Sequence, residues 1–485
     1  MIQEALYASH LLLFLFILPI AIFAQPNQPD DTNTLAFTHA TVIDVVGAKS
    51  LPNMTVVIRD GRIADLGRDG KVPLPRDARI IDSSGKFLIP GLWDMHVHTS
   101  YKSFLTLFVA NGITGVRDMG GSPGEFELLQ QWRQQIRNRT LLGPHIVAAG
   151  IHVDGPIPLG RPNSLNVATE NEAREAVDFL KGRGANFIKV YSMLPREAYF
   201  AIAEEARKQG LSFAGHVPAS ITAREAADAG QQSMEHLFGV LTACSTDESA
   251  LWKEAMSSVA KSGISVFVQA EIGAELKAMI TYDEKKATAL FARFVENGTG
   301  QVPTLAAWRT IETEDDSHFD SDIRLKYMPL ERKGSWKAQR TRFLQSLGAE
   351  YDAKKLRLFE NQLKLVNRMH RAGVLIMTGT DSAAPYVFPG FSLHDELLLL
   401  VRAGLTPMEA LQAATRNPAK FLGLLDSFGS IDRGKIANLV LLEANPLQDI
   451  SNTQKIAAVV IEGQLLTKEA LRSLLADASA MAAEK

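Results

Sequence analysis

His96 and His98 end an apolar run and lie two positions apart, in the stretch Gly-Leu-Trp-Asp-Met-His-Val-His over residues 91–98. In a β-strand, residues i and i+2 point to the same face, so both imidazoles can bind one metal ion from a rigid strand end. The same short pattern also fits two exposed strand histidines. The metal-site interpretation therefore depends on what the rest of the chain supplies.

Later segments supply further ligands, each at the carboxyl end of a predicted strand. The segment 187–191 is apolar and β-branched yet carries Lys189, and a buried lysine is costly unless it is paired, neutralised or used. Two more strands end in histidine and one ends in aspartate. The candidate ligands are His96, His98, Lys189, His216, His236 and Asp381.

Side chains that converge from the ends of several strands are typical of a (β/α)8 barrel. Helical patterns lie between the strands, at residues 169–183 with Thr169 as N-cap and at residues 196–209 before Gly210. We predict barrel strands at residues 87–98, 112–118, 145–153, 186–192, 211–217, 232–237, 301–305 and 374–381.

The two ends of the chain predict a second, smaller unit. Residues 35–89 contain short alternating segments with turn signals, such as Asp60-Gly61, and residues 429–442 and 456–466 are similar. Neither end is long enough for an independent core, so we expect them to pair into one small composite β-sandwich. The predicted fold is α/β, with sandwich parts at 33–89 and 426–470 and the TIM barrel at 90–425.

A charged, weakly periodic stretch at residues 308–350 separates the last two predicted barrel strands. An insertion there would lie over the carboxyl ends of the strands, where the candidate ligands are. It therefore suits a lid or a specificity loop.

Residues 1–24 have the character of a signal peptide. Leu11–Ala24 is almost wholly apolar, too short for a comfortable membrane span, and followed by polar residues 25–31. No Lys or Arg precedes the run, which departs from the usual pattern. We expect cleavage after Ala24, an exported (periplasmic or secreted) protein and no stable membrane anchor, with retention as an anchor as the alternative.

Composition is that of an ordinary globular chain, with 46% hydrophobic and 22% charged residues and a formal net charge of -3. Nothing in this balance points to nucleic acid, and a homo-oligomer is compatible with it. Cys244 is the single cysteine, which excludes an intramolecular disulfide, and we expect it to pack as a small apolar residue.

On its ordered motifs the chain resembles the amidohydrolase superfamily, in the branch of imidazolonepropionase-like and Xaa-Pro dipeptidase-like enzymes. The resemblance covers roughly residues 35–465. Asn438 stands where the family usually has Asp, but this position falls in the predicted sandwich. The motifs that carry the resemblance are Asp94–His98, Lys189 with His216 and His236, Thr378–Asp381, Gly404–Leu411 and Ala414–Ala419.

The ligand set predicts two divalent metal ions, with zinc as the expected metal. His96, His98 and Asp381 would hold one ion, and His216 and His236 the other, so each shell needs a bridging anion. In similar amidohydrolases the lysine at this position carries a carbon dioxide-derived carbamate, which the resemblance implies for Lys189. The alternative is a lysine paired with an acidic neighbour.

The predicted reaction is attack of a metal-bridging hydroxide on a carbonyl carbon, with Asp381 as general base and then general acid. Tyr191 shares the strand face of Lys189 and is a candidate substrate contact, or else a barrel-wall aromatic. His152 lies where similar dipeptidases place a substrate-contacting histidine, or else is a solvated loop residue. His394 is expected to pack near a helix start. No role is assigned to His10, His39, His318 and His370.

We therefore expect a metal-dependent hydrolase of an amide or peptide bond, with a small molecule or a dipeptide of the Xaa-Pro type as substrate. A cyclic amidase and a mononuclear deaminase are the enzymatic alternatives, although a mononuclear deaminase would not need Lys189 in a ligand strand. A non-catalytic binding protein on the same fold is the non-enzymatic alternative, and such proteins usually lose ligands.

Overall fold

The computed structural model describes residues 34–159, 164–263, 266–312, 319 and 321–483. The predicted signal peptide at residues 1–24 lies outside the described residues. In the part of the chain that is described, no helix is long and apolar enough to cross a membrane.

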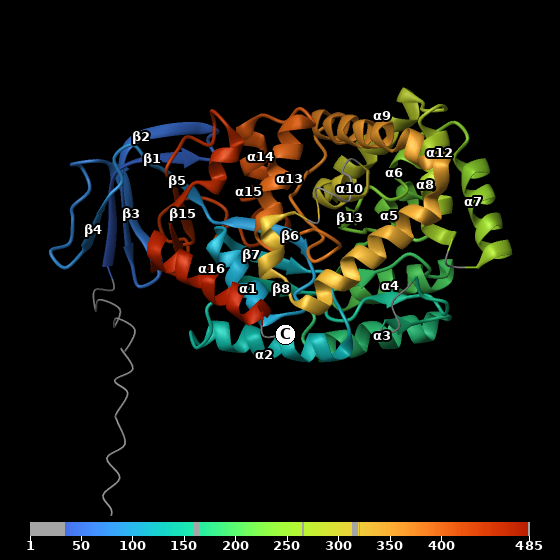
Figure 1. Cartoon of the computed structure of the whole chain (residues 1–485), viewed down its shortest axis with the longest axis horizontal. Helices are drawn as coiled ribbons and strands as arrows, with labels where there is room; N and C mark the ends of the chain where they lie inside the picture. Colours follow the sequence, from blue (N-terminus) through green and yellow to red (C-terminus); the bar gives the residue numbers. More distant parts are fainter. Residues whose placement is uncertain (1–33, 160–163, 264–265, 313–318, 320, 484–485) are drawn as a thin grey trace, which may run out of the picture. The chain divides into compact units, whose positions relative to one another are not determined.

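The two ends of the chain pair in one eight-stranded sheet, as the sequence predicts. In Figure 1 its N-terminal strands are blue and its C-terminal strands, such as β15, are red. Its strands in spatial order are β17 (Gln464–Thr467), β16 (Ile456–Ile461), β15 (Leu439–Leu442), β5 (Phe87–Pro90), β1 (Thr34–Asp44), β2 (Lys49–Arg59) and β3 (Arg62–Arg68), with β4 (Arg79–Asp82) paired to β1.

This sheet encloses an apolar core of its own. Phe37 and Val56 from the N-terminal part lie in one cluster of buried side chains with Leu439 and Val460 from the C-terminal part. The β2–β3 hairpin turns at Asp60 and Gly61, which have φ of 49° and 78°. Positive φ at both turn residues is the geometry that an Asp-Gly pair favours, which explains why the sequence signal is correct.

The barrel strands follow one another in parallel. The strand β6 pairs with β7 and β7 with β8, while β9, β11, β12, β13 and β14 form a second parallel series. The two series meet where Asn186 donates its backbone N–H to the carbonyl of Ala148, 2.8 Å away. The strands are β6 (Leu92–Val97), β7 (Ile113–Asp118), β8 (His145–Ala148), β9 (Val153–Asp154), β10 (Leu165–Asn166), β11 (Phe187–Val190), β12 (Ser212–Gly215), β13 (Ser233–Glu235) and β14 (Gly300–Val302).

The last barrel segment, residues 374–382, is extended but pairs only at isolated positions. Ile376 bridges to Gln301 of β14, and Ser382 bridges to Val97 of β6. Backbone hydrogen bonds reinforce both edges, from Met377 to Gln301 (3.0 Å) and from Met95 to Thr378 (2.9 Å). This segment therefore connects the last strand to the first and closes the barrel.

The connecting segments are helical, and the two helices predicted from capping and periodicity are confirmed as α3 and α4. Thr169 caps α3 in a capping box with Glu172. The helices before the long insertion are α1 (Lys102–Ala110), α2 (Pro123–Arg137), α3 (Glu170–Gly182), α4 (Arg196–Lys208), α5 (Ala223–Asp228), α6 (Val240–Ala243), α7 (Glu248–Ser262), α8 (Phe267–Ala278) and α9 (Glu284–Asn297).

The stretch between the last two barrel segments is mainly helical rather than a loop. It contains α10 (Leu305–Glu312), the 3-10 helix η2 (Ile323–Tyr327) and the first part of α12 (Leu330–Arg371), a 42-residue helix. In Figure 1, α12 runs diagonally in yellow and orange. The remaining elements are α13 (Phe391–Arg402), α14 (Pro407–Ala413), α15 (Arg416–Phe421), η3 (Ile450–Gln454) and α16 (Lys468–Ala483).

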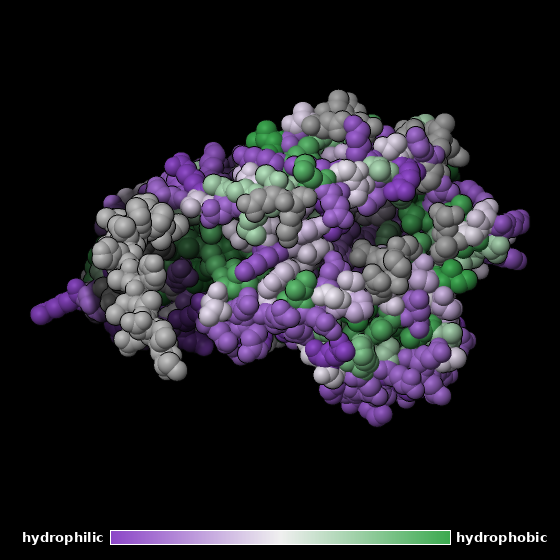
Figure 2. Space-filling model, turned by 60° about the horizontal axis from the view of Figure 1, so that its bottom comes forward, coloured by the Kyte–Doolittle hydropathy of each residue, from purple (hydrophilic) through white to green (hydrophobic). Residues whose placement is uncertain are grey.

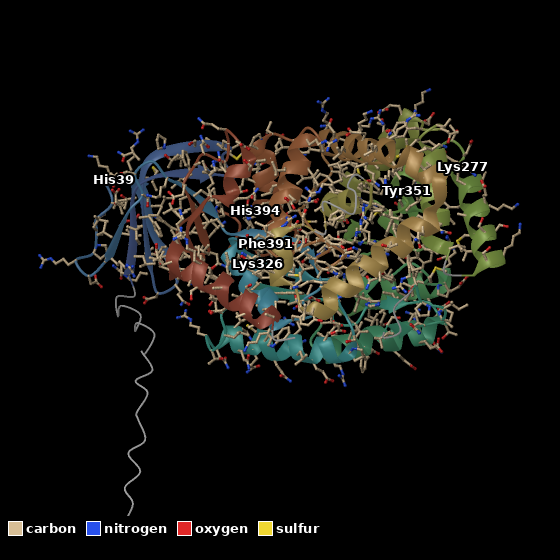
Figure 3. All side chains as sticks on the ribbon, in the orientation of Figure 1. His39, Lys277, Lys326, Tyr351, Phe391 and His394 are labelled. Atoms are coloured by element: carbon tan, nitrogen blue, oxygen red, sulfur yellow. The ribbon has the colours of Figure 1, made fainter. Side chains whose placement is uncertain are left out.

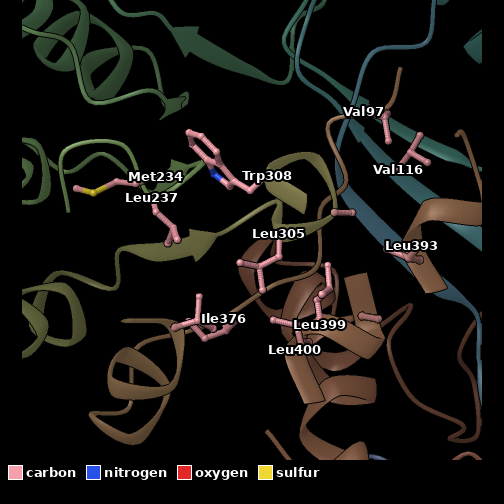
Figure 4. Close-up of a cluster of buried hydrophobic side chains, with 14 of the residues drawn as sticks. Val97, Val116, Met234, Leu237, Leu305, Trp308, Ile376, Leu393, Leu399 and Leu400 are labelled. Carbon is pink, nitrogen blue, oxygen red and sulfur yellow. The ribbon is translucent and has the colours of Figure 1, made fainter. Parts of the chain in front are cut away.

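An apolar layer between strands and helices holds the barrel together. Outward-facing strand residues such as Val97, Met234 and Ile376 lie in one buried cluster with Leu305 and Leu399 from the surrounding helices, as Figure 4 shows. The face drawn in Figure 2 is largely hydrophilic, with green patches between purple areas. A buried apolar layer between strands and helices is expected for parallel strands, because helices cover the faces of such a sheet.

Two predicted strands are divided in the structure. The predicted strand at 87–98 is divided at Gly91, where a Cβ would lie 2.1 Å from Oγ1 of Thr114, so that β5 joins the sheet and β6 the barrel. The predicted strand at 145–153 is interrupted at Gly150, which has a φ of 86°. Residues 468–483 form α16, a helix that the sequence analysis did not address.

Candidate metal centre

The candidate histidines are oriented by hydrogen bonds to Nδ1. The ring of His98 donates to the carbonyl of Gly120 (2.6 Å), and Nδ1 of His96 contacts the Glu235 carboxylate (2.8 Å). Because a carbonyl can only accept, Nε2 of His98 carries the lone pair. The rings of His216 and His236 are also held through Nδ1, which lies 2.7 Å from Oγ of Ser192 and 2.8 Å from Oγ1 of Thr304, respectively.

The opposite ring nitrogens of His96 and His98 converge on Asp381. Oδ1 of Asp381 lies 3.2 Å from Nε2 of His98 and 3.5 Å from Nε2 of His96. Ligand atoms of His96, His236 and Asp381 lie within 4.8 Å of one another. Nε2 of His96 is buried and makes no hydrogen bond to any described residue. Such a nitrogen is costly in a dry interior unless it binds a cation, so these residues fit a divalent metal ion.

The charge state of His96 also suits a ligand. Burial, together with the positive charge of Lys189, holds the pKa of His96 well below its ordinary value. The imidazole is therefore neutral near pH 7, which is the form that binds metal ions. Its ring lies 4.5 Å from that of His236 and 5.5 Å from that of His98, so the imidazoles form one continuous cluster.

A buried ion pair supports His96 from inside the barrel. The side chain of Glu235 bonds His96 through Oε2 and accepts from Nη2 of Arg117 through Oε1 at 2.8 Å. Arg117 also donates to the Met95 carbonyl (2.7 Å) and to Oγ of Ser233 (2.8 Å). A carboxylate behind a ligand histidine fixes its tautomer and increases its basicity. The chain Arg117–Glu235–His96 is thus part of the candidate metal centre.

Left-handed backbone at the strand ends directs the ligands toward the barrel mouth. His236 has a φ of 64°, Asp381 a φ of 60° and Thr304, the hydrogen-bond partner of His236, a φ of 49°. Residues other than glycine rarely adopt this conformation, at a cost on the order of 1–3 kcal/mol each. Backbone bonds hold these turns, including one from Asp381 to the carbonyl of His96 (2.8 Å).

Lys189 lies in the centre of the barrel, as its position in an apolar strand indicates. Its side chain is 1% exposed, and Nζ lies 5.9 Å from the centre of the Tyr191 ring. The strand β11 pairs with β12, which ends one residue before His216. Lys189 is therefore in the same layer as the histidines.

The two candidate substrate contacts lie beside the cluster. The ring of Tyr191 stacks on that of His216, with centroids 4.1 Å apart, and the ring of His152 lies 5.0 Å from Tyr191. His152 is 2% exposed, so it is not a solvated loop residue. All eight residues singled out from the sequence therefore lie in one region at the carboxyl ends of the barrel strands.

Other histidines lie elsewhere, where the structure describes them. His39 is in the sheet, bonded to Asp82, and His394 is in α13, bonded to Thr453; Figure 3 labels both. His370 pairs with Glu409 at the end of α12. Cys244 is buried, and burial raises the pKa of its thiol to about 12, which agrees with the expected packing role. His10 and His318 lie outside the described residues.

Sequence reasoning missed several residues that shape this site. Arg117 and Glu235 form its support, and Phe238 and Trp308 line it, with Phe238 5.0 Å from the ring of His216 and Trp308 donating to the His236 carbonyl. A signal for Arg117 was present. It lies in an apolar strand, as Lys189 does, and the same cost of burying a charge applies to it.

Comparisons with known proteins agree with the observed fold. The model of the amidohydrolase family matches residues 87–466. An ochratoxinase of Aspergillus niger is 25% identical over 475 residues, covering 84% of this chain and 81% of the relative.

Two solved structures show the same fold. A bottromycin amidohydrolase has a TM-score of 0.71 at 23% identity, covering 93% of this chain and 91% of its own. A Xaa-Pro dipeptidase with bound methionine in its active site has a TM-score of 0.66 at 21% identity, covering 90% of this chain and 100% of its own.

The support of His96 by Glu235 can be tested through metal affinity. Glu235→Gln keeps the shape but removes the charge that polarises His96 and neutralises Arg117. We expect metal affinity to fall about 10–100-fold, measured by competition with a chelator. Unchanged metal affinity would mean that Glu235 stabilises the barrel and does not contribute to metal binding.

Glu275→Gln is the matched control for this substitution. Glu275 is also a buried glutamate, but burial raises its pKa to about 8, so the carboxyl group is mostly protonated at pH 7 and resembles the amide. We expect metal affinity to remain unchanged in this variant.

Proposed function

This chain belongs to the amidohydrolase family, and we propose that it hydrolyses the peptide bond of dipeptides of the Xaa-Pro type. As a member of this family it is a hydrolase of carbon–nitrogen bonds. The observation that carries the proposal is the convergence of Nε2 of His96 and of His98 on Oδ1 of Asp381, with His216 and His236 in the same cluster of rings. Asp381 adds a carboxylate to the same cluster.

The ligands divide naturally into two incomplete sets, which supports two divalent metal ions, with zinc as the expected metal. His96, His98 and Asp381 would hold one, and His216 and His236 the other. A carbamate on Lys189 would complete both sets, because its two oxygens can bridge them. When bound, such ions polarise a carbonyl group and lower the pKa of water to near neutrality.

Asp381 is the residue placed to move a proton. Its side chain is 23% exposed, whereas that of His96 is 1% exposed, so the carboxylate reaches the open side of the ligand cluster. One oxygen faces the ring nitrogens of His96 and His98, and the second can take a proton from the attacking water and give it to the leaving nitrogen. The chain then needs no covalent acyl intermediate.

Aromatic and polar groups around the histidines suit a small, partly apolar substrate. Phe238 and Trp308 contribute apolar rings that lie 5.8 Å apart, and Tyr191 and His152, whose rings lie 5.0 Å apart, contribute hydrogen-bonding groups. A dipeptide with a prolyl ring and a terminal carboxylate offers both kinds of surface. The fold shared with a Xaa-Pro dipeptidase supports this substrate class.

The insertion between the last two barrel segments would contribute to specificity. Trp308 in α10 donates to the backbone of His236 (2.9 Å), so this helix contacts the ligand cluster directly. We propose that α10 and the first part of α12 form the lid-like part of the site. A small-molecule or dipeptide substrate would then lie between this lid and the histidines.

A substrate screen tests the proposal. The purified chain, with its metal content measured, is incubated with a dipeptide library, with cyclic amides and with amino-substituted heterocycles. We expect release of proline from Xaa-Pro dipeptides. Turnover confined to cyclic amides, or release of ammonia from a heterocycle, would replace the dipeptidase by a cyclic amidase or a mononuclear deaminase. No turnover at all would favour a binding protein.

Metal stoichiometry tests the role of Lys189. We expect two divalent ions per chain in the native protein and fewer in Lys189→Ala, because the variant lacks the group that joins the two ligand sets. Elemental analysis on protein prepared without chelators measures both. Lys208→Ala, at the exposed end of α4, is the control. A single ion in both the native protein and Lys189→Ala would refute the bridging carbamate.

The proton-transfer role of Asp381 is tested by Asp381→Asn. The amide keeps an oxygen ligand but cannot accept the proton, so we expect most of the metal to be retained while turnover falls at least about a hundredfold. Asp283→Asn is the control, since asparagine caps α9 as well as aspartate does. Equal losses of metal and turnover would make Asp381 chiefly a ligand.

We also propose that the protein is exported to the periplasm or secreted, on the basis of the apolar run that ends at Ala24. Cleavage there would leave no membrane anchor. N-terminal sequencing of the exported fraction should begin at or near Gln25, and an intact Met1 on cytoplasmic protein would refute the proposal.

A further inference from the structure

A cavity lies at the end of the barrel opposite the candidate metal centre. Its volume is about 560 Å³, and it is lined by the first residues of several barrel strands and by the segment after α15. Phe187 and Ala214 belong to its wall, and each is two positions before a candidate ligand, Lys189 and His216. The cavity is therefore one layer of side chains away from the ligand cluster, on the amino-terminal side.

The polar groups of this cavity are cationic or neutral. Among the described residues its lining contains Arg117, His145, Asn186, Ser212 and Gln232, and no carboxylate. Arg117 is only 1% exposed and is the most deeply buried of them. Two further guanidinium groups act on the same region. Burial, together with the charges of Arg133 and Arg137, lowers the pKa of His145 to about 4.

Arg117 has hydrogen-bonding capacity left for a ligand. A guanidinium group carries five N–H bonds. Three are used by Met95, Ser233 and Glu235, and no described residue accepts from the other two. The rings of Phe187 and Phe421 lie 5.5 and 5.3 Å from the guanidinium carbon. A ligand near Arg117 would thus meet a donor and aromatic walls together.

We propose that this cavity binds a small organic carboxylate with an apolar body, held by the guanidinium group of Arg117. The described lining includes the Arg117 guanidinium group and no carboxylate, and Glu235, the acidic partner of Arg117, bonds His96 on the side of the metal centre. Charge-assisted bonds from arginine to carboxylates are among the strongest in proteins, and the aromatic walls favour an apolar body. A metal cation is disfavoured because no anionic ligand lines the cavity.

A ligand bound in the cavity would also change the metal affinity of the candidate metal centre. Arg117 bonds Glu235, and Glu235 bonds His96, each at 2.8 Å. An anion on the far side of Arg117 neutralises part of its charge, so the negative charge of Glu235 acts more strongly on His96. A more negative barrel interior favours a cation at the ligands. Metal binding and carboxylate binding should therefore strengthen each other by the same factor.

Benzoate and its neutral analogue benzamide test the site by calorimetric titration of the metal-loaded protein. We expect saturable benzoate binding in the millimolar range or tighter, and benzamide binding weaker by about tenfold or more. Equal affinity for both would refute an anion site. Absence of saturable benzoate binding up to tens of millimolar would refute the proposal as a whole.

Variants locate the bound benzoate. Leu422→Trp fills the cavity, and Gln232→Glu adds a negative charge at its exposed rim with almost no change of shape. We expect both to weaken benzoate binding, Leu422→Trp by about tenfold or more. Leu128→Trp, at an exposed position of α2, is the control and should bind benzoate normally. Benzoate binding that survives both cavity variants would lie elsewhere, for example on the metal ions, and would overturn the proposal.

Discussion

The buried pair between Arg117 and Glu235 is the interaction on which the barrel interior depends. Both side chains are at most 1% exposed, and removing two charges from water costs several kcal/mol for each ion. That cost is offset by hydrogen bonds to neighbouring groups. Arg117 bonds a backbone carbonyl, a serine hydroxyl and the carboxylate, and Glu235 bonds Arg117, Ser233 and His96. The first barrel strands and the ligand histidine are thereby held in one arrangement.

Glycines inside the barrel leave space for large neighbouring side chains and for close approach of the backbone. A Cβ on Gly115 would lie 2.3 Å from the ring of Trp93, and one on Gly379 would lie 2.3 Å from Cγ1 of Val302. Gly115 is two residues before Arg117 and Gly379 is two residues before Asp381. The side chains of Trp93 and Val302 therefore fill the volume that Gly115 and Gly379 leave empty. This is why the closing segment can approach β6 closely enough for Asp381 to reach the histidines.

The barrel could be predicted from the sequence, and the candidate ligands could be named from it, because both depend on local patterns. A histidine or aspartate at the end of an apolar strand is visible in the chain, and the parallel barrel brings all strand ends to one face. What holds the ligands could not be predicted in this way. The partners of His98 and His236 are a backbone carbonyl at Gly120 and a hydroxyl at Thr304, and neither residue type signals a contact made across the barrel. Gly91 and Gly150 were read within strands because tertiary packing decides where a strand divides.

Burial also separates the carboxylates of the site by role. Asp94 and Glu235 are fully buried, and Asp94 accepts bonds from the backbones of His96 and Thr380 and from the Thr380 hydroxyl. Both carboxylates orient other groups and are closed to water. Asp381 is the carboxylate of this set whose side chain reaches solvent, at 23% exposure. A group that passes protons to and from a substrate must contact the substrate, whereas a group that orients a candidate metal ligand must stay in one position. Asp94 and Glu235 therefore stabilise the site, and Asp381 is the carboxylate suited to proton transfer.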